Sequence, residues 1–98
     1  MYFLQFEVTP NSAHPRKETL GGAIVSCWVQ SDSIEKSTEI ATKNIRECGF
    51  LVDAPDSATE TSRDDWKKDE TSLERFDSAI QDGEAYVFQE WPVDEPEK

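Results

Sequence analysis

The run from Ala23 to Gln30 constrains the fold more than any other segment of this chain. It places Ile24 and Trp28 on one pleat face and Val25 and Cys27 on the other. A strand that is apolar or small on both faces is typical of the interior of a sheet, where neither face meets bulk water. We therefore expect a central strand here, and the rest of the chain has to supply its neighbours and its cover.

Three other segments have the character of strands. Residues 2–8 alternate between large apolar and mostly polar side chains, with the period of two expected of a half-buried strand. Residues 50–54 form a short apolar run that ends at Pro55, and residues 84–91 form the last apolar run before Pro92. We predict a sheet of four strands from these segments and the central one.

Two segments between the strands have the signals of helices. Each has a polar residue followed three positions later by Glu, which is the spacing of a capping box, and each ends at a glycine suited to a left-handed cap. The pairs are Asp32 with Glu35 and Thr71 with Glu74, and the closing residues are Gly49 and Gly83. Apolar side chains fall on one stripe in each segment, so we expect two amphipathic helices.

The predicted order is β-β-α-β-α-β. We expect an α+β two-layer sandwich in which a four-stranded, mainly antiparallel sheet carries both helices on one face. In the order of its elements this arrangement resembles the ferredoxin-like sandwiches, from which it departs because no helix is visible between the first two strands. Either residues 11–21 contain a distorted helical turn, or the topology is a variant of that fold.

We expect one domain, residues 1–92, followed by a frayed acidic tail over 93–98. Residues 11–22 and 56–71 are polar enough to be loops. A single helical turn is expected within 62–68, with Trp66 as its large apolar anchor.

The sequence contains no recognisable catalytic or metal-binding motif. Cys27, Cys48 and the single His14 cannot complete a zinc site, so the cysteines are expected to be two buried free thiols, with a bridge between them or a redox role as the alternatives. Gly21 and Gly22 precede a strand, whereas a phosphate loop leads into a helix. We predict no enzymatic activity and no cofactor.

The negative charge is concentrated in the second half of the chain. Residues 1–59 hold eight acidic and five basic side chains, and residues 60–98 hold thirteen and five, within a formal net charge of −11. Nucleic acids and anionic membranes attract basic surfaces, so neither is an expected partner. An acidic face favours a basic protein partner. The chain start lacks a signal peptide and no segment could span a membrane, so a cytoplasmic location is expected.

Three functions from different classes follow as hypotheses. The first is a small protein-interaction module, with a homodimer as one form, that uses a sheet edge or an aromatic sheet face carrying Trp28, Tyr86 or Phe88. The second is an acidic inhibitor or immunity-type protein. Its candidate contact residues are Asp64, Asp65, Asp69, Glu70, Glu74 and Asp77. The third is a small-ligand pocket between sheet and helices, lined by Trp28 and Cys27.

Overall fold

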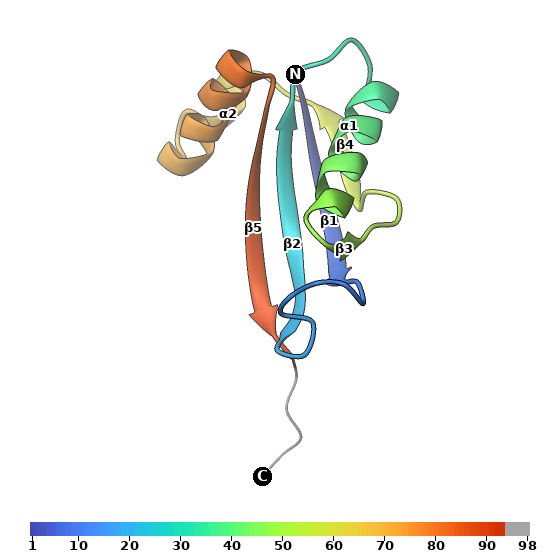
Figure 1. Cartoon of the computed structure of the whole chain (residues 1–98). Coiled ribbons are helices and arrows are strands. Elements are labelled where there is room, and N and C mark those ends of the chain that lie inside the picture. The colour runs from blue at the N-terminus through green and yellow to red at the C-terminus, as the bar shows by residue number, and fades with distance from the viewer. Residues whose placement is uncertain (94–98) are drawn as a thin grey trace.

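The computed structural model describes residues 1–93, as an antiparallel sheet with two α-helices (Figure 1). The strands are β1 (Tyr2–Pro10), β2 (Leu20–Val29), β3 (Phe50–Leu51), β4 (Ser57–Glu60) and β5 (Glu84–Pro92). The helices are α1 (Ile34–Glu47), the short 3-10 helix η1 (Arg63–Trp66) and α2 (Glu70–Asp82). Of the predicted acidic tail, residues 94–98 lie outside the described residues.

The sheet is built around the hairpin of β1 and β2. Its order is β3-β1-β2-β5, and every pairing is antiparallel. The short strand β4 also pairs with β1, opposite Tyr2 to Gln5, while β3 pairs with the last two residues of β1. The expectation that residues 23–30 form a central strand is confirmed, because β2 pairs with β1 on one side and with β5 on the other.

The two faces of the sheet have separate cores. On one face α1 contributes Ala41 and Ile45 to a cluster with buried side chains of β1 and β2. Phe50 of β3 and Val52, which follows β3, belong to the same cluster. On the opposite face α2 contributes Phe76 and Ala79 to a cluster that also holds Trp28, and Trp66 of η1 packs against it. The sheet therefore carries α1 on one face and α2 with η1 on the other.

The prediction that both helices share one face is wrong. The reason is visible in β2 itself, since Cys27 points to the α1 side and the large ring of Trp28 points to the other. Phe3 of β1 lies beside Trp28, with ring centroids 4.9 Å apart. A face with two such rings needs its own cover to exclude water. One helix on each face provides that cover.

The predicted count of four strands and the ferredoxin-like order are not found. The strand expected over 50–54 ends at Leu51, and pairing with β1 resumes only at Ser57. The segment between β1 and β2 forms turns and no helix. Five strands in the order β3-β1-β2-β5, with β4 beside β1, replace the expected four.

The ends of the helices are set by short local hydrogen bonds. Ser33, one residue after the expected cap, accepts a bond from the backbone N–H of Lys36 (3.1 Å). Asp69, two residues before the expected cap, accepts one from the N–H of Ser72 (3.2 Å). The glycine ends are confirmed, because Gly49 and Gly83 have φ values of 98° and 97°.

Gly21 and Gly22 stand at an irregularity in the pairing of β2 with β5. A Cβ at Gly22 would lie 2.6 Å from Cζ2 of Trp91 and 2.8 Å from the Val8 carbonyl oxygen. The indole of Trp91 thus rests directly on the glycine backbone, and any larger residue would displace it.

Candidate functional site

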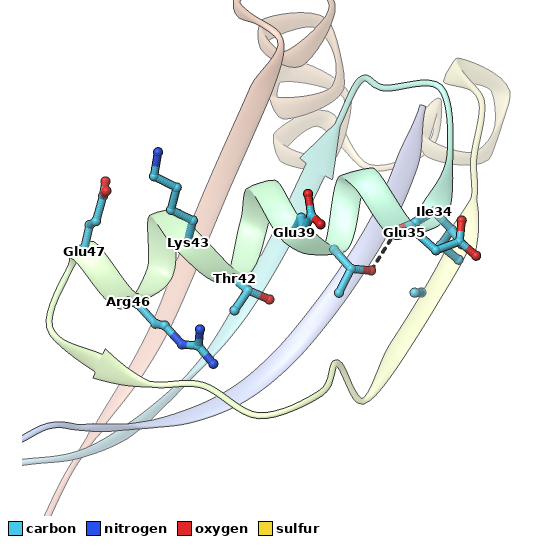
Figure 2. Close-up of a pocket in the computed structure, with 9 residues that line it drawn as sticks. Ile34, Glu35, Glu39, Thr42, Lys43, Arg46 and Glu47 are labelled. Carbon is cyan, nitrogen blue, oxygen red and sulfur yellow. Dashed lines mark hydrogen bonds between the residues drawn. The ribbon is translucent and has the colours of Figure 1, made fainter.

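An open groove runs between α1 and the short strand β4. It is lined by side chains along the whole length of α1 and by Ala58 of β4, and has a volume of about 730 Å³. The full set of lining residues, which defines the α1–β4 groove, is Ile34, Glu35, Thr38, Glu39, Thr42, Lys43, Arg46, Glu47 and Ala58. Figure 2 shows these side chains along the helix, with the segment that leads from β3 to β4 below them.

The groove exists because α1 buries only one stripe of its surface. Ser37, Ala41 and Ile45 are the buried residues of the helix. Thr38 and Thr42 follow Ser37 and Ala41 by one position, so they lie about 100° further around the helix, toward β4. Their side chains are partly exposed, because none of the other elements within residues 1–93 covers that side of the helix. The result is a strip of methyl groups and hydroxyls beside an unoccupied space.

The β4 strand borders this space with backbone groups that have no partner strand. Thr61 donates its backbone N–H to the Met1 carbonyl (2.9 Å). In an antiparallel ladder hydrogen-bonded pairs alternate, so odd-numbered residues of β4 bond to β1 and even-numbered ones face away. Ala58 and Glu60 therefore direct their N–H and C=O groups outward, because β4 pairs with β1 alone among the strands described.

The side chains of Ala58 and Glu60 both lie on the α1 side of the sheet. Ala58 is opposite Leu4 and Glu60 is opposite Tyr2, and both partners belong to the core under α1. The strand β4 runs antiparallel to β1, while α1 starts at the end of β2 next to the N-terminus (Figure 1). Glu60 is thus at the end of β4 that is closer to the start of α1, although it is not itself one of the lining residues.

Charge is unevenly distributed along the α1–β4 groove. Glu35 lines the groove at the start of the helix, and Glu39 follows one turn later. Glu60 is not a lining residue, but its place at the end of β4 adds a third acid near this end. At the other end Arg46 points toward the strands, while Lys43 and Glu47 project from the other side of the helix (Figure 2). Arg46 is held there by a bond from its Nη2 to the Val52 carbonyl (3.2 Å).

The acidic residues near the start of α1 have no ion-pair partner within the part of the chain that the structure describes. Within residues 1–93 neither Glu35 nor Glu60 forms a salt bridge, since the three ion pairs found there join Arg16 to Glu90, Arg63 to Asp77 and Lys67 to Asp64. Charges at the edge of a groove that have no internal partner are free to pair with a ligand.

The acidic residues predicted as a contact surface are mostly used inside the fold. Asp65 accepts bonds from the Ser62 N–H and the Thr61 hydroxyl, which lower its pKa. Asp69 caps α2, and Asp64 is 4.0 Å from Lys67. Of the six, only Glu70 and Glu74 have neither a salt bridge nor a side-chain hydrogen bond among those found in residues 1–93.

Asp77 has the strongest of these internal contacts. Its two carboxylate oxygens accept bonds of 3.0 and 3.2 Å from the guanidinium of Arg63, and this pairing lowers the pKa of Asp77. The pair ties α2 to η1. Its geometry is that of a structural clamp between two elements.

The three aromatic residues predicted to form an uncovered face do not lie together. Trp28 is buried beneath α2, with 3% of its surface exposed. Tyr86 and Phe88 lie on the opposite face of the sheet, packed against the α1 core. There Tyr86 donates to Glu84 (2.5 Å) and accepts from Asn44 (2.9 Å), and burial together with Glu84 raises its pKa. Trp28 is closed off from solvent, whereas Tyr86 and Phe88 remain partly exposed.

The two cysteines are free, but only one is buried. Cys27 lies in the α1 core, where burial and, secondarily, the charge of Glu84 raise its pKa to about 12. Cys48, which ends α1, is exposed, contrary to expectation. His14 packs against Phe50, with ring centroids 5.0 Å apart. The high pKa of Cys27 keeps its thiol protonated, so Cys27 is a poor nucleophile.

The pocket expected between sheet and helices, lined by Trp28 and Cys27, does not form as predicted. The two side chains point to opposite faces of β2, and each belongs to a closed core. Residues 1–93 also contain no group of three His, Cys, Asp or Glu side chains that could hold a metal ion. None of the helices described is both long and apolar enough to cross a membrane.

Sequence reasoning missed the α1–β4 groove because it missed β4. The segment Ser57–Glu60 has the sequence Ser-Ala-Thr-Glu, with no large apolar side chain. One sequence signal could have indicated the groove: Thr38, Thr42 and Arg46 follow Ile34 at intervals of four residues, on the side of the helix next to the buried stripe.

The chain matches no protein-family model, no curated protein and no solved structure.

Proposed function

We propose that this chain is a small peptide-recognition module, which binds an extended segment of a partner protein along the free edge of β4, under the side of α1. The observation that carries the proposal is the adjacency of an unpaired strand edge and an open groove. Strand addition uses both features, since the edge supplies backbone hydrogen bonds and the groove receives alternate side chains.

The backbone contribution comes from two residues of β4. Ala58 and Glu60 each have an N–H and a C=O directed outward, which gives four hydrogen-bonding groups to an added strand. In the absence of a partner strand, exposed backbone groups of this kind bond to water. Exchanging water for a peptide gives a modest gain for each bond, so the backbone provides register and general affinity more than selectivity.

The side-chain contribution comes from the groove. Alternate residues of an added strand would point toward α1 and meet Ala58, Ile34 and the methyl groups of Thr38 and Thr42. The volume of about 730 Å³ is within the range of small-ligand sites and has room for such side chains. The apolar part of this lining favours an aliphatic residue at the centre of the peptide.

This proposal retains the interaction-module hypothesis and specifies its surface. The acidic-inhibitor hypothesis receives less support, because four of its six acids already have partners within the fold. An inhibitor that uses them would have to give up contacts that hold η1 and α2 in place.

The proposal is tested by selecting peptides directly. A displayed library of random ten-residue peptides is selected against the immobilised chain, and enriched peptides are synthesised and titrated in solution. We expect binders with an alternating pattern and dissociation constants in the micromolar range, the level typical of small modules that bind by strand addition.

Two matched pairs of variants locate the binding. Ala58→Pro removes an outward N–H but none of the bonds to β1, and Pro is tolerated on such an edge, whereas Ala58→Ser keeps the N–H. Thr42→Trp fills the groove, whereas Thr42→Ala empties it further. Binding that survives both Ala58→Pro and Thr42→Trp, or a library that yields no binder, would refute the proposed function.

A further inference from the structure

The charges at the two ends of the α1–β4 groove specify which peptide fits and in which direction. This step rests on the proposed function. We infer that the groove selects a strand that runs antiparallel to β4 and carries a basic residue opposite Glu60, an aliphatic residue two positions later and a carboxylate two positions after that.

The direction follows from the sheet. All pairings in this sheet are antiparallel, and antiparallel pairs are slightly more stable per residue than parallel ones. An antiparallel strand would enter beside Glu60 and the start of α1, pass Ala58, and leave toward the end of α1. Its N-terminal half therefore meets the acidic end of the groove, and its C-terminal half meets Arg46.

The first two positions follow from the pairing register. A peptide residue directly opposite Glu60 has its Cβ about 5 Å from that of Glu60, and its side chain points to the same face, toward α1. Glu35 borders the same end of the groove. A Lys or Arg at this position would meet two carboxylates that have no salt bridge within residues 1–93.

The peptide residue two positions later is opposite Ala58. Ala58 is the one lining residue from β4, and its side chain is small, while Ile34 and Thr38 line the same groove from the helix. A branched aliphatic residue such as Val would fill this space. A charged residue here would be placed next to apolar groups with no partner of opposite sign.

The third position follows from distances along the two elements. Glu35 and Arg46 are eleven residues apart on the helix, or roughly 16 Å at the rise of an α-helix. Four residues of an extended strand span about 13 Å, and the side chains of an acid and an arginine cover the rest. The residue four positions after the basic one lies beyond the start of β4, beside the segment that carries Asp56, and its carboxylate would compete with Asp56 for the Arg46 guanidinium, since Arg46 and Asp56 both line the neighbouring pocket.

The test uses two peptides of identical composition with blocked ends. The first, Thr-Thr-Lys-Thr-Val-Thr-Glu-Thr-Thr, has the inferred order, and the second has Lys and Glu exchanged. Isothermal titration calorimetry in low salt measures both dissociation constants. We expect the first peptide to bind about tenfold more tightly, since two attractive pairs become two repulsive ones, and the ratio to shrink in high salt.

A charge reversal on the protein provides the control. Glu60→Lys should invert or abolish the preference, whereas Glu74→Lys, the same change on the exposed side of α2, should leave the ratio as it is. Equal binding of the two peptides, tighter binding of the exchanged one, or no binding of the first would overturn this inference. The proposed function fails separately, if library selection yields no peptide that needs the β4 edge.

Discussion

The two helices of this fold cover the two faces of one sheet in different ways. On the α2 side, the rings of Phe3, Trp28 and Trp66 pack at tilted to edge-on angles, with centroids 4.8 to 5.4 Å apart, and α2 and η1 close over them. On the α1 side the helix lies alone, and its flank beside β4 stays open. One face is a closed aromatic core, and the other combines a core with a groove.

The difference extends to the charged residues around each helix. Near α2 and η1, acids act as caps and ion-pair partners for the fold itself. Along the groove, Glu35 and Glu60 have no ion pair within the part of the chain described. Acidic residues that stabilise the fold are therefore separated from those that are free to contact a ligand.

The largest expected effect concerns the closed face. Phe76→Ala removes a buried ring that packs on Trp28 and should destabilise the protein by about 3–5 kcal/mol, measured by urea denaturation. Ile80→Ala on the same helix is the control. Ile80 is 51% exposed, so its loss should cost a small fraction of that amount. Similar losses for both variants would contradict the closed packing of α2.

A smaller effect separates the two helix ends. Gly83→Ala should cost about 1 kcal/mol through its positive φ alone, since open space surrounds a Cβ there. Gly49→Ala should cost more, because the Cβ would also lie 2.9 Å from Cδ2 of His14. Adding His14→Ala to Gly49→Ala isolates this contact, and a double-mutant cycle with no coupling would show that it is absent.

A weaker, pH-dependent effect tests the clamp between η1 and α2. Arg63 lowers the pKa of Asp77 in the folded protein, below the unfolded value of 3.8. The folded state then binds fewer protons, so the clamp stabilises it fully above that value and loses its effect as the pH falls through the lowered pKa. Urea midpoints of wild type and Asp77→Asn should differ slightly at pH 6 and converge in acid. With Glu74→Gln as control, a constant difference at all pH values would contradict the clamp.

The smallest expected effect on stability belongs to the groove. Thr42→Ala and Glu35→Gln should each change the free energy of unfolding by less than about 0.5 kcal/mol, because both side chains border open space. Thermal denaturation checks this expectation. A loss of several kcal/mol for either variant would show that these residues hold the fold together and would remove the contrast with α2.

Local features of the fold could be predicted from the sequence. The two-faced apolar pattern of residues 23–30 identified the central strand, and Gly49 and Gly83 marked the left-handed residues at the two helix ends. Such features depend on neighbours within a few positions. The caps shifted by one or two residues. Ser33 is one residue closer to α1 than Asp32 is, and Asp69 starts α2 earlier than expected, so that Thr71 lies within the helix.

Features that depend on distant segments could not be predicted. An amphipathic stripe shows that a helix has a buried side, but not which face of the sheet receives it. The strand β4 forms because it pairs with the side of β1 that β2 leaves free, and the sequence Ser-Ala-Thr-Glu has no apolar alternation that predicts a strand. The candidate site lies between α1 and β4. It therefore depends both on the sheet face that receives the helix and on the pairing of β4 with β1, and only the structure revealed it.

Amide hydrogen exchange at β4 tests the central claim most directly. The Ala58 and Glu60 amides face outward, whereas the Thr59 amide already bonds to β1. On saturation with a selected peptide, exchange at Ala58 and Glu60 should slow at least tenfold, while the rate at Thr59 changes little. Unchanged exchange at Ala58 and Glu60 in the presence of a bound peptide would contradict strand addition at this edge.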